Sequence, residues 1–305
     1  MTSGSRRSTR TPRRSVVVAA ILVLFAGLVT ACTNDESALD TKPITLTVPK
    51  QPEIAELVPA QIRQSGVLRV GTNPPYQPNE FKNRDGQIIG YDVDLVDAIA
   101  QVLGLRAEYF ESAFDKIIPA VQAGTYDMGM SSFTDSKERE QQVDFVTYYS
   151  AGIQWAQRTG DSVDPNNACG KRVGVQKTTV EDTDEVPAKS AACEKAGKEP
   201  IKKMQFDTQD QAVNALLLGK VDAFSADSPV TAYAIKKTDG QLEATGPVYD
   251  AAPYGFPMAK GSSLGPAVQQ ALQFLIDKGY YKQIAEHWGV EDGMITTARI
   301  NGAES

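Results

Sequence analysis

The sequence contains little of what hydrolases and metalloenzymes need. Its 305 residues include one histidine, His287, and three cysteines. A Ser or Cys nucleophile needs a neighbouring base, but His287 lies in an amphipathic stretch, GYYKQIAEHWG, where a packed or solvated role is the simpler interpretation. The chain also has no G-x-S-x-G element, no P-loop and no metal-ligand spacing. We therefore expect no enzymatic activity, no cofactor and no metal site.

The N-terminus has the pattern of an export signal. Five arginines precede an apolar run, SVVVAAILVLFAGLVTAC, which is short and one-sided for a membrane span of about 20 residues. Residues 1–31 are therefore predicted to be a signal peptide. Val29, Thr30 and Ala31 before Cys32 resemble the cleavage site of bacterial lipoprotein precursors, which implies a lipidated Cys32 on the outer face of a bacterial cell membrane. An ordinary secretory signal is the alternative, and RRSVV leaves twin-arginine export open.

The mature chain lacks a basic surface. Without the five signal arginines, 26 Lys and Arg face 38 Asp and Glu, a formal net charge of −12. Nucleic acids and anionic lipids bind basic surfaces, so we exclude both as partners. The lipid would be the only membrane anchor. Residues 32–56 carry three prolines and no sustained period, and we predict that they form a flexible tether.

Cys169 and Cys193 remain after Cys32 is assigned to the lipid. In an exported protein two remaining cysteines usually pair, and closing this loop gives about 3 kcal/mol in the chain-entropy model. A zinc site would need more ligands than two cysteines and a distant histidine. The prediction is one disulfide, with two free buried thiols as the alternative.

Strand-like and helix-like segments alternate along the mature chain, which predicts an α/β fold. For example, YDVDLVDAIAQVLG places its apolar residues on one helical face before Gly104 ends the helix. Two segments, AVQAGTYDMGMSS and ALLLGKVDAFSAD, share a helix end, a glycine, an aspartate three residues later and a strand. We interpret them as corresponding parts of two βαβ lobes, with chance similarity as the alternative. Ser132 and Asp227 then correspond, each at the outgoing end of its strand, where open α/β sheets bind ligands.

The stretch SSFTDSKERE follows the first of these strands and contains hydroxyls and an arginine. Asp135 or Ser136 can cap the next helix, which is the simpler interpretation of the cluster. Arg139, however, can present a planar fork to a carboxylate, and Asp227 can accept hydrogen bonds from an ammonium group. Thr179 lies at a second helix start, where backbone N–H groups favour an anion, although a cap explains it equally well. The pattern predicts a zwitterion site, and a free α-amino acid is the simplest zwitterion.

Six segments together resemble the polar amino-acid-binding proteins of ABC importers, the family-3 solute-binding proteins. They are GYDVDLVDAIA, FDKIIPAVQAGTYDMGMSSFTDSKERE, VDFVTYY, GKRVGVQKTT, GKVDAFSAD and IDKGYYKQIAEHWG. The resemblance implies a type II periplasmic-binding fold, in which two βαβ lobes are joined by two hinge strands. The implied bounds are 57–152 with 253–290 for lobe 1, 153–252 for lobe 2, hinges near 151–157 and 249–256, and a C-terminal tail at 291–305.

The resemblance also implies how the ligand's carboxylate is held. Arg139 would clamp it from lobe 1, and Thr179 with the Val180 N–H would complete the clamp from lobe 2. Ser132 and Thr134 would form hydrogen bonds with the α-amino and α-carboxylate groups.

The rest of the ligand would meet residues from both lobes. Asp227 would take the ammonium group, and Tyr76 and Phe114 would enclose the aliphatic part, with core packing as the alternative for both. Asn73 stands where relatives place a residue that reads the side chain, often Asp. Thr178 stands where relatives commonly have glycine, which leaves the shape of that loop open.

The sequence thus predicts a monomeric extracytoplasmic lipoprotein that captures a polar amino acid and delivers it to the permease subunits of an ABC importer. Asn73, Gln176 and Ala226 would line the side-chain end with little net charge. This favours a neutral ligand such as glutamine or asparagine and leaves acidic and basic ligands open. The rival hypotheses are a sensory module of a signalling system and a periplasmic enzyme that resembles the exported cyclohexadienyl dehydratases.

Overall fold

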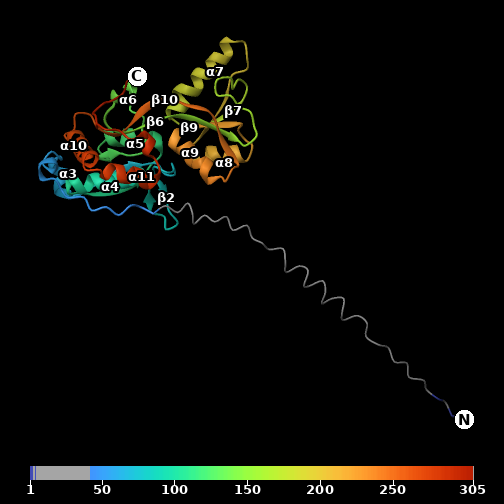
Figure 1. Ribbon diagram of the computed structural model, residues 1–305, viewed down its shortest axis with the longest axis horizontal. Coiled ribbons are helices and arrows are strands. Elements are labelled where there is room, and N and C mark those ends of the chain that lie inside the picture. Colours follow the sequence, from blue (N-terminus) through green and yellow to red (C-terminus); the bar gives the residue numbers. More distant parts are fainter. Residues whose placement is uncertain (3, 5–41, 305) are drawn as a thin grey trace. The chain divides into compact units, whose positions relative to one another are not determined.

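The computed structural model describes residues 1, 2, 4 and 42–304, and the last of these ranges belongs to one compact unit (Figure 1). Eight strands form one mixed sheet in the order β4-β1-β5-β10-β6-β9-β7-β8, and β2 and β3 form a small second sheet. The predicted α/β class is confirmed. The strands are β1 (Val67–Thr72), β2 (Phe81–Lys82), β3 (Ile88–Ile89), β4 (Arg106–Glu111), β5 (Met128–Gly129), β6 (Val143–Arg158), β7 (Arg172–Gln176), β8 (Lys202–Phe206), β9 (Ala223–Asp227) and β10 (Leu242–Ala259).

Helices connect and cover these strands. The α-helices are α2 (Pro52–Ala55), α3 (Ala60–Ser65), α4 (Tyr91–Leu103), α5 (Phe114–Gln122), α6 (Lys137–Glu140), α7 (Val186–Lys195), α8 (Gln209–Leu217), α9 (Ser228–Lys237), α10 (Leu264–Asp277) and α11 (Tyr280–Trp288). A π-helical turn, η2 (Glu181–Glu185), precedes α7, and a 3-10 turn, η3 (Glu291–Gly293), follows α11.

The sheet consists of two halves with the same internal order. In one half β1 lies between β4 and β5, and in the other β7 lies between β8 and β9, with parallel pairing in both. The long antiparallel strands β6 and β10 run through both halves and join them (Figure 1). We call the half with β1, β4 and β5 lobe 1 and the half with β7, β8 and β9 lobe 2.

A repeated ion pair explains the sequence echo between the lobes. In lobe 1, Asp127 accepts hydrogen bonds from the backbone N–H of Arg69 at 2.8 Å and from its guanidinium. In lobe 2, Asp222 does the same for Arg172, again at 2.8 Å from the backbone N–H. Each pair fixes the start of the lobe's middle strand to the start of its neighbour. The two segments therefore have corresponding structural roles, as predicted.

The predicted helical face of α4 forms part of the core of lobe 1. Leu95, Val96 and Ile99 on this face are each 0% exposed. Gly104 ends the helix with φ +69°, a left-handed conformation that glycine adopts without a steric penalty.

The prediction of a flexible tether is wrong for residues 42–56. These residues pack on lobe 1, where Val48 is buried and Ile44 and Leu46 contact the same core. Two backbone N–H groups of this segment also donate to side chains of α4, at 3.0 and 2.9 Å. The alternation of apolar residues in ITLTV is the signal of an extended, half-buried segment, and the three prolines had hidden it.

The signal peptide at 1–31 and the lipidation site at Cys32 cannot be compared with the structure, because residues 5–41 lie outside the described part of the chain. Within the described part, no helix combines the length and the apolar character that crossing a membrane requires.

The C-terminal residues, predicted as a tail, pack along β6. The backbone N–H of Thr147 donates to the carbonyl of Arg299 at 2.8 Å, and the N–H of Asn301 donates to the carbonyl of Phe145 at 3.0 Å. The N–H of Gly302 donates to Asp135 beside α6 at 2.6 Å. The segment is thus an ordered part of lobe 1.

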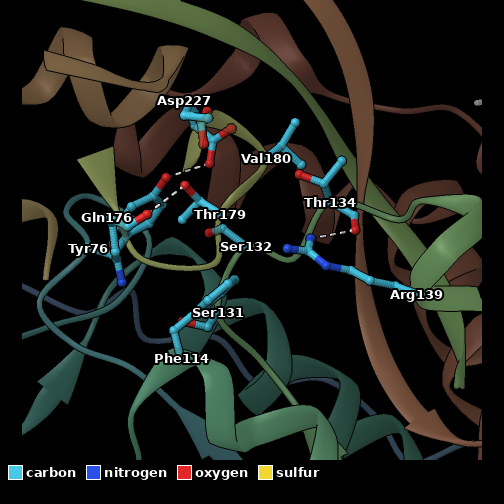
Figure 2. A pocket seen from close by; sticks show the side chains of 11 residues that line it. Tyr76, Phe114, Ser131, Ser132, Thr134, Arg139, Gln176, Thr179, Val180 and Asp227 are labelled. Carbon is cyan, nitrogen blue, oxygen red and sulfur yellow. Dashed lines mark hydrogen bonds between the residues drawn. The ribbon is translucent and has the colours of Figure 1, made fainter. Parts of the chain in front are cut away.

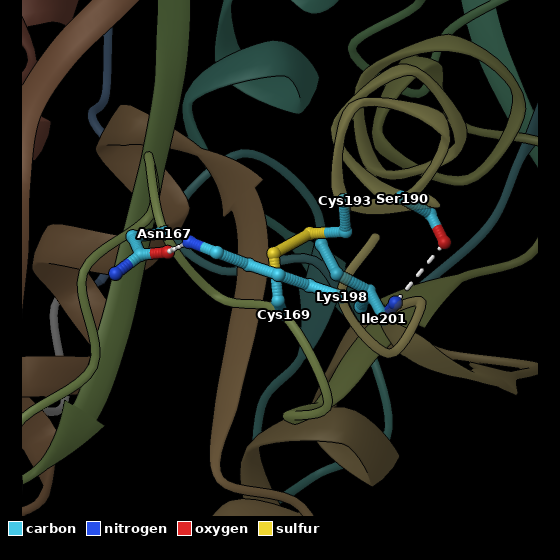
Figure 3. Close-up of a disulfide and its surroundings, with 6 residues drawn as sticks. All are labelled: Asn167, Cys169, Ser190, Cys193, Lys198 and Ile201. Carbon is cyan, nitrogen blue, oxygen red and sulfur yellow. Dashed lines mark hydrogen bonds between the residues drawn. A yellow bond between two sulfur atoms is a disulfide. The ribbon is translucent and has the colours of Figure 1, made fainter. Parts of the chain in front are cut away.

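A disulfide joins Cys169 and Cys193, with their Cα atoms 5.5 Å apart (Figure 3). It connects the segment before β7 to the last turn of α7. Next to it, Lys198 donates to the side chain of Asn167 at 2.9 Å, which links the same two segments again. The predicted disulfide is therefore present in the structure, and it holds α7 beside β7.

Candidate functional site

A cavity lies between the lobes at the carboxyl ends of β1, β5, β7 and β9. Figure 2 shows that side chains from both lobes point into it. Open α/β sheets bind ligands at these strand ends. The cavity is lined by Tyr76, Phe114, Ser131, Ser132, Thr134, Arg139, Gln176, Thr179, Val180, Glu181 and Asp227. Nine of the ten ligand-binding residues predicted from the sequence belong to this set, and the exception is Asn73.

Asn73 lies behind Gln176. Its side-chain oxygen accepts a hydrogen bond from Gln176 Nε2 at 2.9 Å, and its Nδ2 donates to the carbonyl of Ser112 at 2.7 Å. The structure therefore differs from the expectation that Asn73 reads the ligand directly. It orients the Gln176 amide, which does line the cavity.

Ser131 and Ser132 emerge where β5 leaves the core. Ser132 has φ +51°, an uncommon backbone conformation for a residue with a Cβ atom. Its hydroxyl accepts from Asn79 Nδ2 at 2.7 Å and donates to Asp92 Oδ2 at 3.3 Å. The Ser131 hydroxyl donates to Glu80. Two buried carboxyls thus lie directly behind the serines.

Those two carboxyls are deeply buried. Glu80 and Asp92 are each 0% exposed. Burial raises the pKa of Asp92 to about 7, and it raises the pKa of Glu80 well above its usual value, with the charge of Asp92 adding to the effect. Any ionisation of this pair adds negative potential on the lobe 1 side of the cavity.

Arg139 holds its guanidinium across the cavity toward lobe 2. Nη1 donates to the carbonyl of Thr134 at 2.9 Å (Figure 2). Nη2 donates to the carbonyl of Thr178 at 3.0 Å. The guanidinium carbon also lies 5.7 Å from the ring centroids of Phe114 and Phe133. A guanidinium has five N–H donors, so further N–H groups remain for a ligand carboxylate.

Helix capping and ligand contact involve different residues of SSFTDSKERE. Ser136 is the N-cap of α6, and its hydroxyl accepts from the backbone N–H of Arg139 at 3.3 Å. Ser132, Thr134 and the Arg139 side chain line the cavity. Both sequence interpretations therefore hold, each for its own part of the segment.

The turn between β7 and η2 brings Thr179 and Val180 to the cavity. Thr178 has φ +61°, the left-handed region that favours glycine. The turn keeps its shape because Asp182 accepts from the Thr178 backbone N–H at 2.9 Å and the Thr179 hydroxyl donates to the carbonyl of Gln176 at 2.9 Å.

The sequence interpretation missed two of the lining residues, Ser131 and Glu181, and Glu181 is the charged one. Glu181 follows the helix start expected at Thr179, and the structure places it in the cavity, 3% exposed. Burial and the charge of Asp227 raise its pKa to about 8. None of the described residues donates a hydrogen bond to its Oε1. Hydrogen bonds from Thr179 and from its own backbone oppose this rise in pKa. Glu181 is therefore a buried acid with one carboxylate oxygen that has no donor among the described residues.

Glu185 fixes the η2 turn that presents Glu181. Its carboxylate accepts from Trp155 Nε1 at 3.1 Å, from the Tyr249 hydroxyl at 2.7 Å and from the Ser225 hydroxyl at 3.1 Å. These partners lie on β6, β10 and β9, so one side chain ties η2 to the three adjacent strands.

Asp227 ends β9 and accepts a hydrogen bond from the hydroxyl of Tyr76 in the opposite lobe. Burial raises its pKa to about 6, against the opposing effects of the Tyr76 hydrogen bond and the Arg139 charge. Together with the contacts from Arg139 to Thr178 and from Gln176 to Asn73, this bond joins the lobes around the cavity. The structure is thus a closed form.

Comparisons with known proteins agree with this architecture. Residues 68–291 match the model for bacterial extracellular solute-binding proteins, family 3. Over 298 residues the chain is 45% identical to the arginine-binding protein ArgT of Corynebacterium glutamicum, covering 97% of this chain and 98% of that protein.

Two solved structures have a similar fold. An ancestral arginine-binding protein bound to arginine is 33% identical with a TM-score of 0.67, over 73% of this chain and 98% of its own. An ancestral arginine-binding protein bound to glutamine is 35% identical with a TM-score of 0.67, over 74% and 99%. With the sheet order described above, these similarities confirm the predicted type II periplasmic-binding fold.

Proposed function

The chain belongs to the bacterial extracellular solute-binding proteins of family 3, and we propose that its ligand is a cationic amino acid, with arginine preferred. Members of this family capture an amino acid outside the cytoplasm and deliver it to an ABC importer. The proposal concerns which amino acid this cavity selects, and the buried carboxylate of Glu181 is the observation that carries it.

The selection follows from the charges in the cavity. A neutral amino acid brings one carboxylate for Arg139 and one ammonium group for Asp227, and it leaves Glu181 without a counter-ion. Burying an unpaired carboxylate costs free energy, and this cost falls when the carboxylate is protonated or pairs with a cation. Only a ligand with a second positive group pairs all three side chains. This balance favours arginine, lysine or ornithine over glutamine.

Hydrogen-bonding capacity favours arginine among these cations. Gln176 Oε1 and Glu181 Oε1 are buried acceptors that receive no hydrogen bond from the described residues, while Gln176 Nε2 is already bonded to Asn73. A ligand with hydrogen-bond donors can therefore satisfy both acceptors. A guanidinium offers five N–H donors and no acceptor, whereas a glutamine amide brings an oxygen that needs a donor. This proposal replaces the neutral side-chain end expected from the sequence.

The remaining contacts follow the roles expected from the sequence. Arg139 with Thr134, Thr179 and the Val180 N–H would bind the carboxylate, and Asp227 with Ser132 would bind the ammonium group. In doing so the ligand would compete with the Tyr76 hydroxyl for Asp227.

The aliphatic part of the ligand would lie between Tyr76 and Phe114. The ring of Phe114 stacks on Phe133 with the centroids 4.3 Å apart, so it offers a rigid apolar wall that already contacts the carboxylate-binding arginine.

Calorimetric titration with arginine, lysine, citrulline and glutamine tests the proposal. Citrulline has nearly the shape of arginine without its side-chain charge, so the ratio of the two Kd values measures how the cavity reads that charge. We expect arginine to bind most tightly, and at 100 times its Kd it should add about 2.7 kcal/mol to the free energy of unfolding. Equal affinity for citrulline, or tighter binding of glutamine, would contradict the assignment.

Arginine affinity should depend on pH in a defined direction. The pKa of Glu181 is about 8 and that of Asp227 about 6 in the structure described. A bound cation favours the ionised carboxylates, so it lowers both pKa values and binding releases protons. Arginine binding should therefore tighten as pH rises from about 6 to about 8, by at most tenfold per pH unit for each proton, and level off above. Titrations in two buffers with different ionisation enthalpies measure the proton release, which Glu181→Gln should reduce.

We further propose that the protein acts by binding alone, as a monomer that serves permease subunits of an importer. The dehydratase alternative requires a ligand like prephenate, which carries two carboxylates, and the negative cavity of Glu181 and Asp227 opposes such a dianion. Turnover of prephenate-like acids by the purified protein would reverse this choice, and a kinase gene in place of permease genes beside the coding sequence would favour the sensor alternative.

The lipid anchor is proposed from the sequence around Cys32. Replacement Cys32→Ser should prevent lipidation, and the protein should then appear in the soluble fraction or remain unprocessed, because a cleaved signal peptide leaves no lasting membrane attachment and stable anchoring needs acyl chains. Membrane fractionation of cells that express both forms is the measurement. Unchanged membrane association of a serine variant whose signal peptide has been cleaved would refute the anchor.

A further inference from the structure

The ligand cavity continues into a larger groove between the lobes, which we call the acidic groove. Thr134, Val180, Glu181 and Asp227 line both spaces. The outer walls of the groove come from the start of α6, the η2 turn, the hinge residues 250–253 and the C-terminal segment 294–304. Segments far apart in the sequence thus form one surface that leads to the site.

Exposed acidic residues converge on this groove from four segments. Glu138 lies on α6, Asp184 on η2, Asp250 on β10 at the hinge and Glu304 near the C-terminus. The basic residues among the described lining are Lys137 and Arg299, and the ammonium group of Lys137 already pairs with Glu140 at 3.1 Å. The groove is therefore net negative on both lobes.

The inner end of the groove is the carboxylate of Glu181. It is 3% exposed, it lines both spaces, and its Oε1 accepts no hydrogen bond from the described residues. The outer acids lie near enough to act on the site itself, because Asp184 and Glu138 both raise the pKa of Arg139 against the lowering effect of its burial. A series of acidic side chains therefore extends from the solvent-exposed rim of the groove to the ligand cavity.

We infer that the acidic groove steers the cationic ligand toward the cavity and contributes to affinity only through the association rate. The inference rests on the proposed function. Acids on two facing walls focus the negative potential between them, which raises the local concentration of cations and their on-rate. Arginine carries a net positive charge and benefits, whereas citrulline is a neutral zwitterion and does not.

Stopped-flow kinetics on a variant with Glu138→Gln, Asp184→Asn, Asp250→Asn and Glu304→Gln test the inference. We expect the association rate constant of arginine to fall about tenfold at low ionic strength, while its dissociation rate constant and both rate constants of citrulline stay near the wild-type values. Added salt should remove the difference, because exposed charges are screened over about 10 Å at 0.1 M salt.

A control variant has the same net charge as the groove variant but neutralises four exposed acids outside the groove. Its substitutions are Glu53→Gln, Glu56→Gln, Asp85→Asn and Glu194→Gln. It should bind arginine at the wild-type rate, and an equal loss in both variants would assign the effect to net charge instead of the groove. An unchanged association rate in the groove variant overturns the inference alone. Wild-type protein that binds no cationic amino acid in equilibrium titration overturns the proposed function, and the steering role with it.

Discussion

Arg139→Ala and Asp227→Ala should each weaken amino-acid binding by two orders of magnitude or more. In the closed cleft the guanidinium meets the ligand carboxylate and Asp227 meets the ammonium group, so either substitution leaves an opposite charge buried without a partner. Breaking a buried pair in this way costs about 3–5 kcal/mol, and about 1.4 kcal/mol corresponds to a tenfold change in Kd. Calorimetry with arginine measures both losses.

The structure supplies controls for this pair of substitutions. Arg139 also donates to the carbonyl of Thr178, so its removal deletes a contact that joins the lobes without ligand. Arg139→Lys retains a positive charge but loses the planar fork, and it should recover part of the affinity. Tyr76→Phe removes the hydroxyl that bonds Asp227 while it keeps the ring, and we expect a far smaller loss.

Circular dichroism of the unliganded variants decides whether a loss of binding is a loss of folding. An open cleft leaves both charged groups hydrated, so the variants should fold as the wild type does. Near-wild-type affinity in both alanine variants would remove the chemical basis of the amino-acid assignment and would put the sensor or enzyme hypothesis first.

Ser132 and Asp227 could be found from the sequence because of their place at a strand end. Ser132 and Asp227 follow strands whose alternation of apolar residues is clear, and the repeated Gly and Asp before each strand fix the register between lobes. The ion pairs from Arg69 to Asp127 and from Arg172 to Asp222 give that repeat a physical cause. A local pattern therefore predicted where these side chains meet, although they are far apart in the sequence.

The residues misjudged from the sequence depend on contacts that no local pattern contains. Glu181 enters the cavity because a π-helical turn, held by Glu185 against three strands, precedes α7. With α-helical spacing, the sequence predicts only that Glu181 is an acidic residue in the first turn of a helix. Asn73 does not line the cavity, because Gln176 from the other lobe bonds to it and lies between it and the cavity. Both outcomes were decided by tertiary packing.

The same contrast explains the two chain ends. Residues 42–56 and 291–304 lack long periodic segments, so composition favoured a tether and a tail. Their order comes from backbone N–H groups that bond to lobe 1, as Ile44 does with Asp94 and Gly302 with Asp135. Such bonds leave no periodic signal in the segment that donates them.

Glu181→Gln should change which ligand the protein prefers. The substitution keeps the size of the side chain and removes the third charge of the cavity, so arginine loses the partner of its guanidinium. Truncating one partner of a buried, hydrogen-bonded charge pair costs about 2–5 kcal/mol, which corresponds to a Kd for arginine at least about 25-fold weaker. Citrulline and glutamine leave no charge unpaired in the variant, so their affinity should stay the same or improve.

Calorimetry at pH 8 or above is the appropriate measurement, because the pKa of Glu181 is about 8 and the wild-type carboxylate must be ionised for the comparison. Asp184→Asn is the matched control, since it removes an exposed acid from the same η2 turn. In about 0.1 M salt, where the steering effect of exposed groove acids is screened, it should leave the equilibrium Kd of arginine nearly unchanged. Equal losses for arginine and citrulline in Glu181→Gln would mean that Glu181 supports the turn without reading the ligand's charge. Undiminished arginine binding would mean that the side-chain cation is bound elsewhere in the cleft, and Glu80 and Asp92 behind the two serines would then be the acids to replace next.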